Sequence, residues 1–202
     1  MLLNSQKSLM LNYIRRKNNY IRSANLVNHK IMILSPLQNT AWFDSRWVQK
    51  RPFITQIFGV NPKVYEQFGL KGHNGIDLRC AVGTPLFASF DGQVKVGNDG
   101  AKSGYGKYIK MRGGDREITY GHLNSQEVTE GQYVKMGELI GYTGNTGFST
   151  GPHLHITLKQ IVPSGRQIWL WMVKNVDNGY KGAYDPQPYL ITWKGSLLNE
   201  TL

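Results

Sequence analysis

Two short segments bring histidine and aspartate side chains together at even spacings. His73 and Asp77 are four residues apart, and His153 and His155 are two residues apart. In an extended chain, residues at even spacing point to the same face, so each segment can present two polar groups to one ion. Gly75, between His73 and Asp77, removes side-chain bulk and allows the backbone to bend there.

Two imidazoles and one carboxylate form a ligand set for zinc. Catalytic zinc sites use three protein ligands and keep a fourth position for water. The positive charge that remains acidifies water and polarises a carbonyl group. The HxxxD and HxH patterns are weak support when taken alone, because they arise often by chance and most histidines are structural or solvated. Their weight depends on the segments around them.

The segments around these histidines have strand and turn patterns. Glycine is abundant, with 23 of 202 residues, and short apolar runs alternate with turn sequences such as Asp91-Gly92 and Gly113-Gly114. Many short strands with little helix favour an all-β fold, an antiparallel β-sandwich or open barrel with a groove for the metal. We predict strands over residues 75–80, 86–89, 92–96, 108–112, 117–121, 139–142 and 153–158.

Charge divides the chain into parts. The net charge is +11, and residues 1–51 carry +8 of it, with nine Lys and Arg against Asp44, while residues 52–202 carry +3, with 15 bases against 12 acids. We expect a basic N-terminal extension and linker over 1–51, irregular or partly helical, a β-rich domain over 52–190 and a C-terminal tail over 191–202. The basic segment would attract anionic polymers or form a solvated tail.

Cysteine count and hydropathy bear on disulfides, membrane spans and export signals. Cys80 is the one cysteine, so it cannot form an internal disulfide, and we expect it to be a small buried residue. No apolar run approaches the roughly 20 residues of a membrane span. The N-terminus has no clear signal peptide, because no apolar core followed by a cleavage site is present.

The order of short motifs along residues 56–158, with a looser match as far as residue 190, carries a resemblance to a known family. The series resembles the lysostaphin/LytM-type zinc metallopeptidases, the M23 family of cell-wall endopeptidases, and covers about half the chain densely. The matching segments, in order, are Gln56-Ile57-Phe58-Gly59, Gly72-His73-Asn74-Gly75-Ile76-Asp77, Gly83-Thr84-Pro85-Leu86, Asp91-Gly92-Gln93-Val94, Gly104-Tyr105-Gly106, Thr119-Tyr120-Gly121-His122-Leu123, Gly131-Gln132-Tyr133-Val134, Gly137-Glu138-Leu139-Ile140-Gly141, Gly144-Asn145-Thr146-Gly147, Ser149-Thr150-Gly151-Pro152-His153-Leu154-His155 and Asp185-Pro186.

The resemblance implies a role for each of five residues. His73, Asp77 and His155 would bind one Zn²⁺ per chain. His122 and His153 would be the catalytic histidines, which orient water, transfer protons or stabilise the oxyanion. All five positions are filled, which argues against a member that has lost its activity.

The family's substrate groove is lined by loops between the strands. In this chain the corresponding segments are 60–71, 98–105, 124–126 and 145–150. Within them Tyr65, Tyr105 and Asn145 are the candidate substrate-binding residues. The alternative for the aromatic residues is that they pack their own loops.

The resemblance implies a zinc-dependent endopeptidase that hydrolyses peptide cross-links or bridges of bacterial peptidoglycan. The bond stays open between a glycine bridge, a D-Ala cross-link and another stem-peptide bond. The expected partners are stem and bridge peptides and, through the basic segment, anionic wall polymers, with no specific nucleic acid and no membrane span. The protein would act at the cell wall, extracellular, periplasmic or phage-delivered. The alternatives are a phage virion-associated domain, a non-catalytic wall-binding or activator module of the same fold, and a nucleic-acid binder suggested by the charge.

Overall fold

The computed structural model describes residues 33–34, 53–163 and 171–191. The chain divides into two units, Met1–Ile33 and Leu34–Leu202, and all described residues except Ile33 belong to the second. Nearly all of the expected extension 1–51, and the tail 191–202 beyond its first residue, lie outside the described residues. Within the described ranges, no helix is long and apolar enough to cross a membrane.

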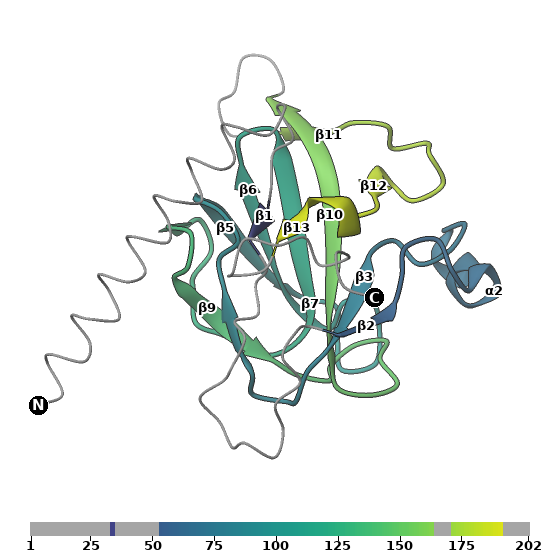
Figure 1. Ribbon diagram of the computed structural model, residues 1–202, viewed down its shortest axis with the longest axis horizontal. Helices are drawn as coiled ribbons and strands as arrows, with labels where there is room; N and C mark the ends of the chain where they lie inside the picture. Colours follow the sequence, from purple (N-terminus) through teal and green to yellow (C-terminus); the bar gives the residue numbers. More distant parts are fainter. Residues whose placement is uncertain (1–32, 35–52, 164–170, 192–202) are drawn as a thin grey trace, which may run out of the picture. The chain divides into compact units, whose positions relative to one another are not determined.

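Most of the described strands belong to one antiparallel sheet (Figure 1). The strands lie in the order β2-β3-β10-β7-β6-β5-β8, while β11 and β12 pair with β10, and β9 pairs with both β7 and β4. The predicted all-β, antiparallel fold is therefore confirmed. The strands of this sheet are β2 (Phe53–Gln56), β3 (Ile76–Arg79), β4 (Pro85–Phe87), β5 (Gly92–Asn98), β6 (Lys107–Gly113), β7 (Arg116–Gln126), β8 (Tyr133–Val134), β9 (Leu139–Thr143), β10 (His153–Pro163), β11 (Trp171–Val173) and β12 (Ala183–Tyr184).

Helical structure in the described residues is short. It consists of α2 (Pro62–Tyr65), followed directly by the 3-10 turn η1 (Glu66–Phe68), and of the 3-10 turn η2 (Gln187–Tyr189). Two two-residue strands, β1 (Ile33–Leu34) and β13 (Leu190–Ile191), lie outside the main sheet.

Strand β10 separates the apolar core from a polar face. Its residues Leu154, Ile156 and Leu158 have no exposed surface. Side chains alternate along a strand, so His155 and Thr157 point to the opposite face. Because β10 lies between β3 and β7 in the sheet, its polar face is held by hydrogen bonds on both sides.

All seven predicted strands are present. Among the described residues, six short strands were not predicted: β2, β8, β11 and β12 in the main sheet, and β1 and β13 outside it. Two of the predicted groove loops differ from the expectation. Residues 124–126 form the end of β7, which pairs with β9 there, and residues 60–71 contain α2 and η1. The sequence pattern missed the extension of β7 because its last residues are polar.

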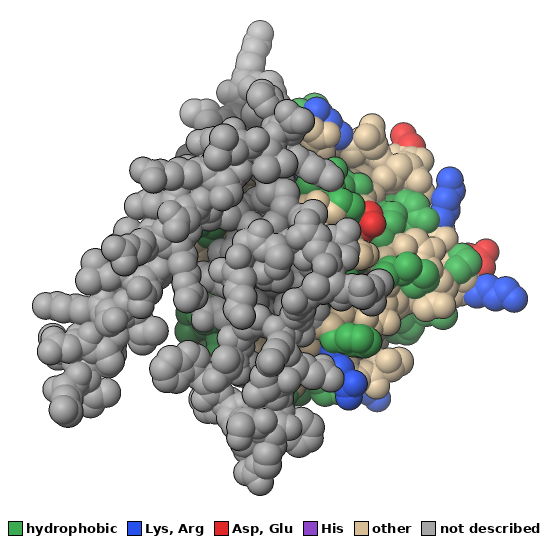
Figure 2. Space-filling model, viewed as in Figure 1, with side chains coloured by type: hydrophobic (Ala, Val, Ile, Leu, Met, Phe, Trp, Pro, Cys, Tyr) green, Lys and Arg blue, Asp and Glu red, His purple; other side chains and the backbone are tan. Residues whose placement is uncertain are grey.

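The basic excess of the chain is not a property of the visible domain surface. In the view of Figure 2, the Lys and Arg side chains of the described residues are scattered among apolar and uncharged ones. This agrees with a net charge of +3 for residues 52–202, against +8 for residues 1–51.

Candidate metal centre and active site

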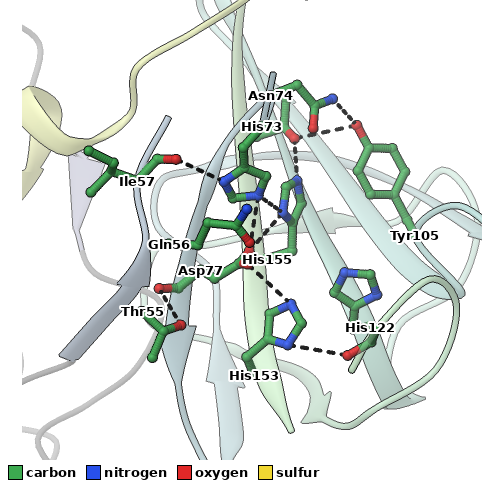
Figure 3. Close-up of polar contacts among 12 residues, drawn as sticks. Thr55, Gln56, Ile57, His73, Asn74, Asp77, Tyr105, His122, His153 and His155 are labelled. Atoms are coloured by element: carbon green, nitrogen blue, oxygen red, sulfur yellow. Dashed lines mark hydrogen bonds and ion pairs between the residues drawn. The ribbon is translucent and has the colours of Figure 1, made fainter. Parts of the chain in front are cut away.

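Three atoms of the type that bind metals converge in a buried cluster (Figure 3). His73 Nε2 lies 2.9 Å from His155 Nδ1 and 3.2 Å from Asp77 Oδ1, and His155 Nδ1 lies 3.0 Å from the same oxygen. The three residues are only 1%, 6% and 4% exposed for His73, Asp77 and His155. Among the described residues, they are the one group of His, Cys, Asp or Glu side chains with a geometry that could hold a metal ion.

Strand pairing and one glycine bring this cluster together. Asp77 on β3 and His155 on β10 are directly opposite each other in the ladder. His73 lies before β3, beyond bends at Asn74 and Gly75, and its backbone is held by hydrogen bonds of 2.8 Å to Val60 and Gly59. The two strands approach so closely at Gly75 that an added Cβ would lie 2.1 Å from the carbonyl oxygen of Ile156 and 2.9 Å from His155 Cε1. Glycine is therefore required at this position.

A hydrogen bond on the outer side of the His73 ring sets its tautomer, and one on the outer side of the His155 ring is compatible with a matching arrangement. His73 Nδ1 lies 3.1 Å from the carbonyl oxygen of Ile57, which can only accept, so Nδ1 carries the proton and Nε2 presents a lone pair. His155 Nε2 lies 2.8 Å from Thr157 Oγ1, and donation there leaves Nδ1 unprotonated as well. Such outer partners are typical of metal-binding histidines.

The cluster fits a small divalent cation. Two nitrogen lone pairs and a carboxylate oxygen face one another at 2.9–3.2 Å, which is unfavourable without a positive charge between them. A tetrahedral ion with ligands about 2.0–2.1 Å away separates those ligands by roughly 3.3 Å. Small side-chain displacements would reach that spacing.

The surroundings favour the protonation states that a metal requires. Burial acts to raise the pKa of Asp77, but hydrogen bonds and positive charge from the rings of His155 and His73, when those rings carry a proton toward the carboxylate, outweigh it and hold that pKa well below its usual range. A bound cation would take the place of those protons and keep the carboxylate charged in the same way. Burial lowers the pKa of His155, so its ring stays neutral. A charged carboxylate and neutral imidazoles are the forms in which these side chains bind metals.

Two further histidines lie beside the cluster. His153 Nε2 is 3.5 Å from Asp77 Oδ2, and the rings of His153 and His122 are 4.6 Å apart at their centroids. Each ring donates from Nδ1 to a main-chain carbonyl, His122 to Thr146 at 2.7 Å and His153 to Gly151 at 2.8 Å. Both histidines therefore keep Nε2 available as an acceptor.

His122 has an unusual backbone. Its φ is 62°, in the left-handed region, although it lies within β7. Its N–H donates to the carbonyl oxygen of Tyr105 at 2.7 Å, which helps to hold this conformation. Burial, together with the nearby rings of His155 and His153, lowers the pKa of His122 to about 3. Strained conformations of this kind concentrate at functional sites.

A cavity of about 590 Å³ opens over the cluster, and two of the three substrate candidates line it, Tyr65 and Tyr105. The ring of Tyr65 stacks on His73 with centroids 5.1 Å apart, and its hydroxyl donates to Gln56 at 3.2 Å. Asn145 is not among the lining residues. It is exposed, and its Oδ1 accepts a hydrogen bond from Ser149 at 2.7 Å.

Asn74 and Thr157 support the site, although neither was predicted from the sequence to belong to it. Asn74 donates to the hydroxyl of Tyr105 at 2.8 Å, and that hydroxyl lies 3.4 Å from Thr157 Oγ1. Thr157 follows His155 by two residues on a strand, so alternation alone indicates that the two side chains share a face.

Comparison with known proteins identifies the family. A model described as peptidase family M23 matches residues 71–168. The chain is 30% identical to the solved catalytic domain of lysostaphin from Staphylococcus simulans, with a TM-score of 0.50, and the match covers 68% of this chain and 91% of that domain. The chain belongs to peptidase family M23.

Longer relatives share the same region. An uncharacterized metalloprotease of Haemophilus influenzae is 38% identical over 110 residues, which are 54% of this chain and 23% of the relative. The peptidoglycan DD-endopeptidase ShyA of Vibrio cholerae is 41% identical over 87 residues, 43% of this chain and 20% of the relative. The solved structure of a zinc containing peptidase from Vibrio cholerae matches with 26% identity and a TM-score of 0.50, over 75% of this chain and 38% of that one. The match thus spans about a quarter or less of the two longer sequence relatives.

Proposed function

We propose that this protein is a zinc-dependent endopeptidase that cleaves peptide cross-links or bridges of bacterial peptidoglycan. The supporting observation is the convergence of His73 Nε2, Asp77 Oδ1 and His155 Nδ1 within 3.2 Å of one another, in a chain of family M23. Relatives named as a peptidoglycan endopeptidase and as a zinc containing peptidase support the choice of substrate and metal.

The cluster residues would bind one Zn²⁺, and each of the neighbouring histidines would have a separate task. Bound there, the ion supplies Lewis acidity to the scissile carbonyl and lowers the pKa of water. His153, with its acceptor Nε2 near Asp77, is suited to take a proton from the attacking water and to pass it to the departing amine. His122 is held neutral and buried with Nε2 as an acceptor, so it is suited to take up a proton during the reaction and, once protonated, to donate from Nε2 to the charge that develops on the carbonyl oxygen.

Tyr65, Tyr105 and Asn145 are proposed to contact the peptide. The two tyrosines line the cavity, and the hydroxyl of Tyr105 is anchored by Asn74 at 2.8 Å. Asn145 lies outside the lining, so its contact would require an elongated substrate that extends past the cavity. Replacement of any of the three by Ala should raise KM for a peptidoglycan peptide and leave the zinc content unchanged.

Two measurements test the proposed function together. The zinc content of the purified protein should approach one ion per chain, and a chelator should stop the solubilisation of purified peptidoglycan until zinc is restored. Mass spectrometry of the released fragments should find new amino termini from peptide bonds and no new sugar ends. A protein that binds zinc but releases no fragment from several defined peptidoglycans would instead be a non-catalytic wall-binding module.

The setting of this activity is also proposed. The protein would act at the cell wall, and the net charge of +8 on residues 1–51 supports an interaction with anionic wall polymers. A fragment over 52–190 should fold and retain activity on soluble peptides, but should sediment less with whole walls than the full chain. If the full chain sediments equally with native walls and with walls stripped of anionic polymer, the role given to the basic segment is wrong.

A further inference from the structure

The cavity over the cluster of His73, Asp77 and His155 extends to two lysines. Lys159 and Lys181 line the same cavity as Asp77, His153 and His155. Within the described part of the chain, neither ammonium group has a hydrogen bond or an ion pair. The cavity therefore contains two ammonium groups that no carboxylate of the described residues holds in an ion pair, although the charge of Glu117 acts on Lys159.

Lys159 belongs to the floor of the cavity. It lies four residues after His155 on β10, and therefore on the same face, at a distance along the strand of about 13 Å. Its cross-strand neighbour Glu117 is already paired with Arg112 at 2.7 Å. Burial lowers the pKa of Lys159, so a bound anion would restore the stability of its charged form.

Lys181 is fixed beside the cavity by its loop. Its φ is 53°, in the left-handed region that a lysine rarely adopts. The side-chain oxygen of Asn178 accepts hydrogen bonds from the N–H groups of Tyr180 at 2.8 Å and Gly182 at 3.1 Å, one on each side of Lys181. The loop is thus held in the conformation that presents this lysine at the edge of the cavity.

We propose that Lys159 and Lys181 bind a free carboxylate of the peptide substrate, about four extended residues from the bond at the metal cluster. Ammonium groups form strong charge-assisted hydrogen bonds with carboxylates. This proposal rests on the proposed function and narrows it, because it selects an acidic stem peptide over an uncharged glycine bridge. A neutral bridge would leave both ammonium groups without a counter-ion.

The test uses two cross-linked synthetic stem peptides that differ only in whether their carboxylates are free or amidated. With the zinc-loaded full chain, Lys159→Met and Lys181→Gly should each raise KM for the acidic peptide about tenfold, with kcat within about twofold. For the amidated peptide, KM should change by less than about twofold. Lys181→Gly keeps the fold, because glycine adopts the left-handed conformation at no cost.

Two variants serve as matched controls. Asn175 also has a φ of 53° in the same loop, so Asn175→Gly relaxes the backbone without removing a charge. Lys95→Met removes a positive charge from β5, outside the residues that line the cavity. Neither variant should change KM for the acidic peptide. Calorimetric titration of zinc-loaded His122→Ala with each peptide adds a measurement of binding that is independent of turnover.

The possible outcomes separate this proposal from the proposed function. If the lysine variants raise KM equally for both peptides, or leave KM for the acidic peptide unchanged, the carboxylate assignment is wrong while the endopeptidase function stands. If the wild type cleaves neither peptide but binds the acidic one through the two lysines, the carboxylate site stands and the cleavage of stem-peptide cross-links fails. Selective loss of acidic-peptide affinity, with zinc content unchanged, supports both.

Discussion

The Nδ1 atom of His122 lies 2.7 Å from the main-chain carbonyl oxygen of Thr146. Because a carbonyl can only accept, this contact fixes the proton on Nδ1 and leaves Nε2 as an acceptor. His73 and His153 make the equivalent contact with other main-chain carbonyls, at 3.1 and 2.8 Å. Three of the four site histidines are thus held in the same tautomer from outside.

The two kinds of histidine should be separable by substitution. His122→Ala should lower kcat by about 10²–10⁴-fold, because it removes an acid–base or charge-stabilising group, while zinc content stays near one ion per chain. His155→Ala should lose both zinc and activity, since two ligands bind the ion poorly. Metal analysis and digestion of purified peptidoglycan measure both effects, and wild-type digestion by His122→Ala would refute the role given to that residue.

The hydroxyl of Thr157 should tune metal affinity. It lies 2.8 Å from His155 Nε2, and Thr157→Val removes it with little change in volume. Zinc affinity should fall by roughly 10–100-fold, the usual cost of losing such an outer partner. Competition with a chromophoric chelator measures this, and Thr157→Ser, which keeps the hydroxyl, should bind zinc nearly as the wild type does. Equal affinities for Val and Ser variants would show that the hydroxyl has no such role.

Because the backbone of β10 lies so close to Gly75, this position should not tolerate a residue with a side chain. In Gly75→Ala the new Cβ would meet the carbonyl oxygen of Ile156 at 2.1 Å, so β3 or β10 must shift. We expect a loss of about 1–3 kcal/mol in the free energy of unfolding, together with weaker zinc binding. Gly151→Ala is the control, because a Cβ there meets no atom within 4 Å. Similar melting temperatures for the two variants would contradict this account.

Cys80 should react slowly with alkylating agents. Burial raises the pKa of its thiol to about 11 from an ordinary value of 9.0, so at pH 8 the reactive thiolate is about 100-fold scarcer than for an unperturbed cysteine. Mass spectrometry of iodoacetamide-treated protein should find slow modification that accelerates as the pH rises toward 11. The same protein in denaturant is the control, and equal rates in both conditions would be inconsistent with burial of the thiol.

The Cys80 thiol should also make the free energy of unfolding depend on pH in the alkaline range. Its pKa is higher in the folded than in the unfolded protein, so the unfolded state loses the proton first. The contribution to stability is complete below pH 9 and is lost as the pH rises through 11. Cys80→Ala should remove this part of the alkaline decline, as measured by chemical denaturation at several pH values.

Part of the cluster of His73, Asp77 and His155 could be predicted, because the placement of its two strand residues follows from strand alternation and pairing. The even spacing of His153 and His155 places both on one face of β10, and strand pairing sets Asp77 opposite His155. The spacing of His73 and Asp77 predicted their convergence, but His73 lies before β3, beyond two bends, so its position depends on the loop rather than on strand alternation. The antiparallel β-rich fold was likewise predictable, because it depends on local turn residues and short apolar runs.

Other features depend on contacts that local patterns do not encode. The left-handed φ of His122 exists because the strand is held by distant partners, and the sequence around it reads as an ordinary strand. Asn145 lies in a turn near the site, but spacing along the chain does not determine whether a loop residue points into the cavity. Lys181 lies in a loop outside every recognised motif and reaches the cavity only through tertiary folding.

The outward hydrogen bonds of the histidines have a consequence for sequence change. The accepting groups at Ile57, Thr146 and Gly151 belong to the main chain, so replacing those side chains leaves the acceptors in place while the backbone path is kept. The tautomers of His73, His122 and His153 therefore do not depend on which side chains occupy these three loop positions. Those loops can diversify toward new peptides without retuning the chemistry beneath them.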